Sequence, residues 1–261
     1  MPTLTNDTPG PTADLEALAW LDTARRTFTQ RRGAASDPEL VVQLAVGAAA
    51  RSVHTLGFAG GELTSWTAEE SVPCDFALSL TPADAVALIR RDESRPGALA
   101  RTKLLEPLDG SVRALPLPPL DLDATQAADA LPVIPNLSFS VEWRLADTLF
   151  GRWRFSLVIV DGRIVTPTPP AVDVPDVVVL LPYWAYLRLR SGMWDVLEAL
   201  DAGGGLEGDI PALAAAGGLV ETDEFREFFA TGGAVHLDAL AAFAVVLASQ
   251  PWRRLVEELG T

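Results

Sequence analysis

Cysteine and histidine are scarce in this chain. Among its 261 residues there is one cysteine, Cys74, and there are two histidines, His54 and His236. One cysteine excludes an internal disulfide and a multi-thiolate metal site, and the chain contains no HxxxH, HExxH or CxxC spacing. We therefore predict no metal, no cofactor and no catalytic cysteine.

Positive charge and long apolar runs are also in short supply. Twenty Lys and Arg residues oppose 35 Asp and Glu residues, which gives a net charge of −15. A negative field repels phosphates, so nucleic acid is not an expected partner. The longest apolar run, Leu240 to Ser249, is too short to span a bilayer. Residues 1–12 lack the apolar core of a signal peptide, so a cytoplasmic location is expected.

What the chain does contain is apolar residues. Hydrophobic residues make up 49% of it and charged residues 21%, which excludes disorder over most of its length. The mean hydropathy is +0.22, high for a soluble protein. Either the core is large, or apolar surface is kept for a ligand or a partner.

The sequence also repeats after about one hundred residues. Residues 51–63 fall on residues 152–164, and each segment has the pattern of a strand, a two-residue turn and a returning strand. The turns, Gly60-Gly61 and Asp161-Gly162, are pairs that reach the positive φ of a tight hairpin. The order of elements therefore predicts an internal duplication.

The duplication continues on both sides of the hairpin. A further strand ends at Pro82 in one copy and at Pro182 in the other, and helices are predicted over 83–91 and 183–201. Residues 137–145, before the second hairpin, alternate between apolar and polar side chains. This pattern predicts a strand with Ser138, Ser140, Glu142 and Arg144 on a wet outer face.

These patterns predict an α+β fold with two similar units. Each unit is expected to hold a sheet framed by helices. The predicted boundaries are a loose N-terminus (1–13), a first unit (14–114), a linker rich in Pro and Leu (115–122), a second unit (123–232) and C-terminal helices that pack on the core (233–261).

The second half resembles the sterol carrier protein type 2 family. The resemblance rests on the hairpin 153–165, the buried strand 176–181 with the helix that follows it, and the glycine-rich segment 203–210. It covers about residues 122–229, and the first half matches less well, with its Gly-Asp segment reduced to residues 109–111. The resemblance implies that each unit holds a mainly antiparallel mixed sheet of about five strands, covered by helices on one face. It also implies an apolar tunnel that binds lipids, and no catalytic residues to carry over.

We therefore predict non-catalytic binding or transfer of a hydrophobic small molecule. His54 is predicted as a core histidine, with a polar contact to the ligand as the alternative. Two other functions stay open, namely an enzyme acting on a lipid-like or polyketide-like substrate in the same cavity, and a module that binds a protein or a second copy. The predicted ligand-binding residues are Phe139, Val141, Trp143, Trp153, Phe155, Leu157, Trp184, Leu187, Trp194 and Phe228.

Overall fold

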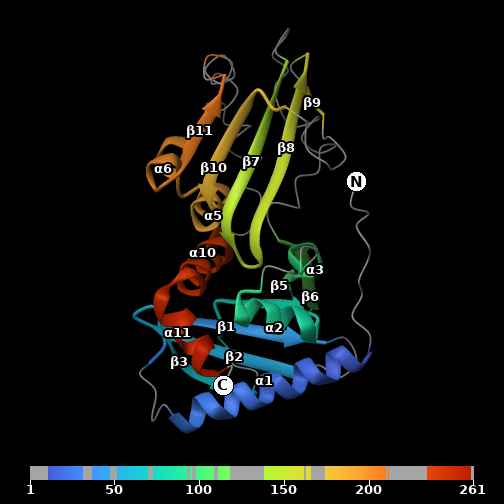
Figure 1. Ribbon diagram of the computed structural model, residues 1–261, viewed down its shortest axis with the longest axis vertical. Helices are drawn as coiled ribbons and strands as arrows, with labels where there is room; N and C mark the ends of the chain where they lie inside the picture. The colour runs from blue at the N-terminus through green and yellow to red at the C-terminus, as the bar shows by residue number, and fades with distance from the viewer. Residues whose placement is uncertain are drawn as a thin grey trace. The chain divides into compact units, whose positions relative to one another are not determined.

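The chain forms two compact units in the computed structural model. Unit 1 consists of residues 1–117 and 245–261, and unit 2 of residues 118–244. Each unit contains one mixed sheet with helices, so the chain is an α+β protein (Figure 1). The structure describes residues 11–31, 37–47, 52–69, 73–92, 95, 98–108, 111–117, 138–161, 163–165, 174–209, 211 and 234–259.

Unit 1 has a six-stranded sheet in the order β3-β2-β1-β4-β5-β6. Neighbouring strands run antiparallel except β1 and β4, which are parallel. The strands are β1 (Leu40–Val46), β2 (Ser52–Ala59), β3 (Glu62–Thr67), β4 (Phe76–Leu80), β5 (Lys103–Leu108) and β6 (Ser111–Pro116).

Local sequence explains how these elements begin and end. Gly60 and Gly61 both have positive φ, as the tight turn between β2 and β3 requires. Thr81 caps helix α2 (Pro82–Arg90) through its side-chain oxygen, and Pro82 occupies the first turn, where its missing N–H costs nothing. The helix predicted over 83–91 is confirmed.

Three helices cover the sheet of unit 1. Helix α1 (Pro11–Arg31) packs on α2 and β3, and the C-terminal helix α11 (Gln250–Leu259) packs on α1, α2 and β3. Within α11, the Trp252 ring lies 5.9 Å from the Phe58 ring, and its indole N–H donates to the Ile89 carbonyl at 3.0 Å. A short helix, α3 (Ala98–Arg101), precedes β5.

Unit 2 has a five-stranded sheet in the order β11-β10-β7-β8-β9, again with one parallel pair, β7 and β10. Helix α5 packs on β7 and β10, and helix α6 on β10. The elements are β7 (Phe139–Thr148), β8 (Gly151–Val160), β9 (Arg163–Val165), β10 (Val177–Pro182), α5 (Tyr183–Arg190), α6 (Val196–Asp201), β11 (Gly205–Gly208) and α10 (Ala234–Ala248), which continues into unit 1.

The two sheets share strand order and also register. The strand order β3-β2-β1-β4-β5 in unit 1 matches the order β9-β8-β7-β10-β11 in unit 2. Leu44 faces His54 in the first sheet, and Trp143 faces Phe155 in the second. Each position of β1 therefore corresponds to the position 99 residues later in β7, and each position of β2 to the position 101 residues later in β8.

The parallel strand keeps the same offset. Val42 pairs with Phe76 in unit 1, and Val141 pairs with Val177 in unit 2. The offset is thus again 99 residues between β1 and β7, and it is 101 residues between β4 and β10. Two similar units with mainly antiparallel mixed sheets are thus present, as the sequence predicts.

One carboxylate recurs at the start of both parallel strands. In unit 1, Asp75 Oδ2 accepts a hydrogen bond from the backbone N–H of Val41 at 2.6 Å. In unit 2, Asp176 Oδ2 accepts from the backbone N–H of Ser140 at 2.7 Å and from its hydroxyl at 2.9 Å. Asp75 and Asp176 are 101 residues apart, so the same side chain joins the parallel strand to the first strand in each unit.

The helix predicted over 183–201 is interrupted in the structure. Helix α5 ends at Arg190, Gly192 takes a positive φ of 71°, and α6 starts afresh after Asp195. Asp195 and Glu198 form a reciprocal capping box, which makes a new helix start favourable at this point. Gly162 of the second turn lies outside the described residues.

Candidate functional site

One face of the sheet in unit 2 is apolar from end to end. Side chains that are directly opposite on β7 and β8 share a face, because alternate residues of a strand point the same way. The parallel strand β10 adds to this face through its register with β7. The apolar face of unit 2 consists of Phe139, Val141, Trp143, Leu145, Trp153, Phe155, Leu157, Ile159, Val177, Val179 and Leu181.

Helix α5 brings aromatic rings onto this face. Trp143 and Phe155 stack with parallel planes and centroids 6.0 Å apart. The Tyr186 ring meets both of them edge-on, at 5.9 Å from Trp143 and 5.8 Å from Phe155. Such edge-to-face contacts stabilise by about 0.5–1.5 kcal/mol beyond area burial. The three rings therefore hold α5 against the middle of the face.

Two large aromatic residues of β8 remain partly exposed on the apolar face, namely Trp153 and Phe155. The indole nitrogen of Trp153 is itself buried and has no hydrogen-bond partner within the described part of the chain. A buried N–H without an acceptor is unusual in proteins. An oxygen of a bound molecule would satisfy it.

A polar pair lies on the buried side of α5, which sequence reasoning missed. Arg190 is only 2% exposed, and its Nη1 lies 3.5 Å from the hydroxyl of Tyr186 one helical turn earlier. The equivalent of Arg190 in unit 1, at an offset of 101, is Ile89. The i, i+4 spacing of Tyr186 and Arg190 is a sequence signal for this contact, although it does not show burial.

The structure brings together only part of the predicted ligand-binding set. The six predicted residues of β7 and β8 share the apolar face, and Leu187 of α5 is fully buried. Trp184 and Trp194 instead pack against each other at 5.6 Å, with the Arg188 guanidinium 5.7 Å and 4.9 Å from their ring centroids. Phe228 lies outside the described residues.

The opposite face of this sheet is not wet at all the positions predicted. Ser140 is 6% exposed and Glu142 is 2% exposed, so the expected outer face is wrong at both. A buried carboxylate needs a charged partner. Glu142 has such a partner, because its Oε1 accepts from Arg144 Nε at 2.6 Å.

His54 lies in the core of unit 1. Its side chain is 3% exposed; Nδ1 accepts a hydrogen bond from the indole N–H of Trp66 at 3.2 Å, and Nε2 lies 3.2 Å from the Ser52 hydroxyl. Burial lowers the pKa of His54, and the Arg25 guanidinium lowers it further, while Asp22 raises it. The prediction of a core histidine with satisfied nitrogens is therefore confirmed.

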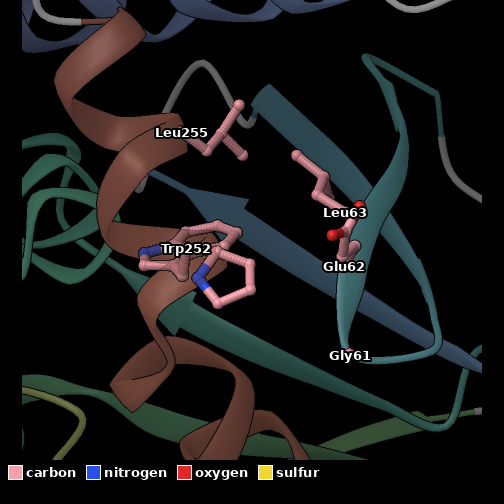
Figure 2. Close-up of a pocket in the computed structure, with 6 residues that line it drawn as sticks. Gly61, Glu62, Leu63, Trp252 and Leu255 are labelled. Carbon is pink, nitrogen blue, oxygen red and sulfur yellow. The ribbon is translucent and has the colours of Figure 1, made fainter.

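A small hollow opens beside the C-terminal helix of unit 1. Figure 2 shows Trp252 and Leu255 of α11 opposite Gly61–Leu63 of the β2–β3 hairpin. Its volume is about 10 Å³, which accommodates roughly one water molecule. A hydrocarbon chain does not fit. The lining residues are Gly61, Glu62, Leu63, Pro251, Trp252 and Leu255.

The described residues contain no group of three or more His, Cys, Asp or Glu residues arranged to hold a metal ion. None of the helices in the described part of the chain is long and apolar enough to cross a membrane.

Comparison with known proteins gives no family. No family model matches the sequence, and no curated protein matches it. The crystal structure of a GCN5-related N-acetyltransferase from Kribbella flavida aligns at 20% identity, over 67% of this chain and 44% of that one. The TM-score of this alignment is 0.22, which is too low to indicate a shared fold.

Proposed function

We propose that unit 2 binds a hydrophobic small molecule on its apolar face and does no chemistry on it. The ligand class is a fatty acyl, sterol-like or similar lipid-like metabolite. The resemblance to the type 2 sterol carrier family supports this proposal, because it implies a mixed, mainly antiparallel five-stranded sheet, and unit 2 has one.

A comparison of the two units carries the proposal. Equivalent positions on the two apolar faces differ in how completely they are covered. Unit 2 is the more open at four matched pairs on the first two strands, whereas unit 1 is slightly the more open at Leu40, Phe76 and Leu80. The exposed fractions in units 1 and 2 are 0% and 6% for Val42 and Val141, 0% and 6% for Leu44 and Trp143, 0% and 8% for Leu56 and Leu157, and 1% and 6% for Phe58 and Ile159.

The next pair along β2 and β8 shows the largest contrast in chemistry. His54 is buried and bonded in unit 1, whereas Phe155 in unit 2 presents a partly exposed ring. An apolar ring left partly exposed beside a buried face provides the lining that an apolar ligand needs. The unpaired Trp153 indole N–H nearby on β8 supplies a donor for one ligand oxygen.

The expected affinity follows from area burial. Each buried methylene gains about 0.8 kcal/mol, so a sixteen-carbon chain gains roughly 13 kcal/mol before association costs of at least about 4 kcal/mol. The remainder corresponds to a Kd near the micromolar range. Shortening the chain by two methylenes should weaken binding by roughly fifteen-fold.

The test is titration of the full chain with an anthroyloxy-labelled stearic acid, followed by displacement with unlabelled acids of decreasing length. Phe155→Ala should weaken probe binding by roughly ten-fold or more, because a half-buried ring contact is lost. Val160→Ala is the matched control, since Val160 is on the same strand but is 46% exposed on the other face, and should leave binding unchanged. Absence of saturable binding by the wild-type chain contradicts the proposal.

A protein-binding module is the second candidate. Met193 and Leu197, around the start of α6, are 54% and 71% exposed, which is unusual for large apolar side chains that are close in sequence. Light scattering on the same preparation distinguishes this function, because self-association that Met193→Ser weakens would favour it.

A further inference from the structure

The buried His54 is held by two side chains whose hydrogen-bonding roles are fixed. An indole N–H can only donate, so Nδ1 of His54 must be the acceptor from Trp66. The neutral ring then carries its proton on Nε2, which donates to the Ser52 hydroxyl. The Trp66 ring stands at 68° to the imidazole, with centroids 6.1 Å apart.

Protonation of His54 on Nδ1 breaks the hydrogen bond from Trp66. A proton on Nδ1 would point at the indole N–H of Trp66, and two donors cannot bond each other. The charged ring would also be buried at 3% exposure, which is unfavourable without an acceptor or counter-ion. Both effects oppose the charged form in the folded state.

The surroundings do not neutralise the charge. The cross-strand neighbour of His54 on β1 is Leu44, and its hydrogen-bond partner on β3 is Trp66. From α1 the charged groups acting on it are Arg25, which lowers its pKa, and Asp22, which raises it. Hydrogen bonds from Arg25 lower the pKa of Asp22 in turn, so Asp22 stays ionised through mildly acidic pH.

We propose that His54 is an acid-sensitive latch that holds the edge of unit 1 closed. Strand β3 is the edge strand of its sheet, and Trp66 is one of its buried anchors. Helix α1 packs on β3. When His54 takes up a proton, β3 and α1 loosen and uncover the apolar side chains of β2, such as Leu56 and Phe58.

The direction with pH follows from linkage. The unfolded or opened chain has a histidine pKa near 6.5, and the closed state has a lower one. The closed state is therefore fully favoured above about pH 6.5. Below that value the opening equilibrium rises by up to ten-fold per pH unit, until the pH reaches the lowered pKa of the closed state.

Two measurements test the latch. In the His236→Gln variant the remaining imidazole resonance belongs to His54, because the chain has two histidines. Its titration midpoint should lie below 6.5 in the folded protein. Hydrogen exchange, corrected for intrinsic rates, should show more opening of β3 and α1 at pH 5.5 than at pH 7.5, with β7 and β8 unchanged. A midpoint at or above 6.5, or equal opening at both pH values, overturns the proposal.

Two variants separate the latch from burial alone. His54→Phe copies the residue at the matching position of unit 2, Phe155, and should abolish the acid response. Trp66→Phe keeps a ring but removes the opposing N–H, so the His54 titration midpoint should rise toward 6.5. An unchanged midpoint in Trp66→Phe would show that the indole N–H has no part in the response, and it remains informative even where His54→Phe does not fold.

Discussion

Replacing Asp84 by alanine removes the most deeply buried carboxylate among the described residues of unit 1. Asp84 lies in the first turn of α2 and is 0% exposed. Its Oδ1 and Oδ2 accept from Nη2 and Nε of Arg101 at 2.8 Å and 3.0 Å, and Nε of Arg95 lies 3.3 Å from Oδ1. This bidentate bond raises the pKa of Arg101 above its usual value.

The expected loss of stability in Asp84→Ala comes from the two arginines that lose their partner. Removing one partner of a buried ion pair typically costs about 3–5 kcal/mol, because the other charge loses its partner. Arg95 and Arg101 keep 27% and 34% of their side chains exposed, so water recovers part of the loss. We expect the lower end of that range, about 3 kcal/mol, which is a large fraction of the 5–15 kcal/mol that stabilises a typical domain.

Urea unfolding followed by circular dichroism measures this loss in the full chain. Arg101→Ala and the double variant Asp84→Ala/Arg101→Ala complete a double-mutant cycle, and the double variant should regain at least about 1 kcal/mol relative to the sum of the single changes. A loss below about 1 kcal/mol for Asp84→Ala, or a coupling near zero, would refute the reasoning. Position 185 is the matching position in unit 2 and holds alanine, so the backbone itself accepts this side chain.

Two further stability predictions follow from individual hydrogen-bonding side chains. Trp252→Phe keeps a ring but loses the donor to the Ile89 carbonyl, so thermal unfolding of unit 1 should show a loss of about 1–2 kcal/mol, and no change would contradict the contact. Asp176→Ala should cost about 1–3 kcal/mol in urea titrations, because Asp176 accepts from both the N–H and the hydroxyl of Ser140. An unchanged unfolding midpoint would contradict the role of this carboxylate in joining the two strands.

Strand pairing could be predicted because local signals agreed with the long-range fold. Gly60-Gly61 and Asp161 mark the two hairpin turns, and the alternation through β7 and β8 identifies one apolar face. Six of the predicted ligand-binding residues belong to that face for this reason. A period-2 pattern fixes which side chains share a side, so no knowledge of distant segments was needed.

Contacts on helices were harder to predict. Trp184 and Tyr186 are two positions apart on α5, and two positions turn a helix by about 200°, so the two rings point to different sides. Tyr186 reaches the apolar face, whereas Trp184 packs on Trp194. The interruption at Gly192 was also missed, because Asp195 and Glu198 read equally well as positions within one long helix.

Burial of polar residues depends on distant segments and was not visible in the sequence. The alternation placed Glu142 on an outer face, yet it is 2% exposed and paired with Arg144. C-terminal helices were predicted to pack on the core, but the sequence did not indicate that α11 belongs to unit 1. A stripe of apolar residues shows that a face will be covered, and not by what.

The duplicated sheet separates what the backbone requires from what function requires. Strand order, register and the carboxylate at the parallel strand are the same in both units, so these features belong to the scaffold. The side chains at the matched positions His54 and Phe155 are not the same, and each is surrounded differently: one by hydrogen-bonding partners in a closed core, the other by rings on a more open face. The same backbone position accepts either histidine or phenylalanine. The two residues can therefore support separate roles, an acid-sensitive closure in unit 1 and an apolar binding face in unit 2. Exchanging the two residues tests this separation: His54→Phe should leave fatty acid binding intact while Phe155→His should weaken it, and equal effects on binding would mean that the two faces do not act independently.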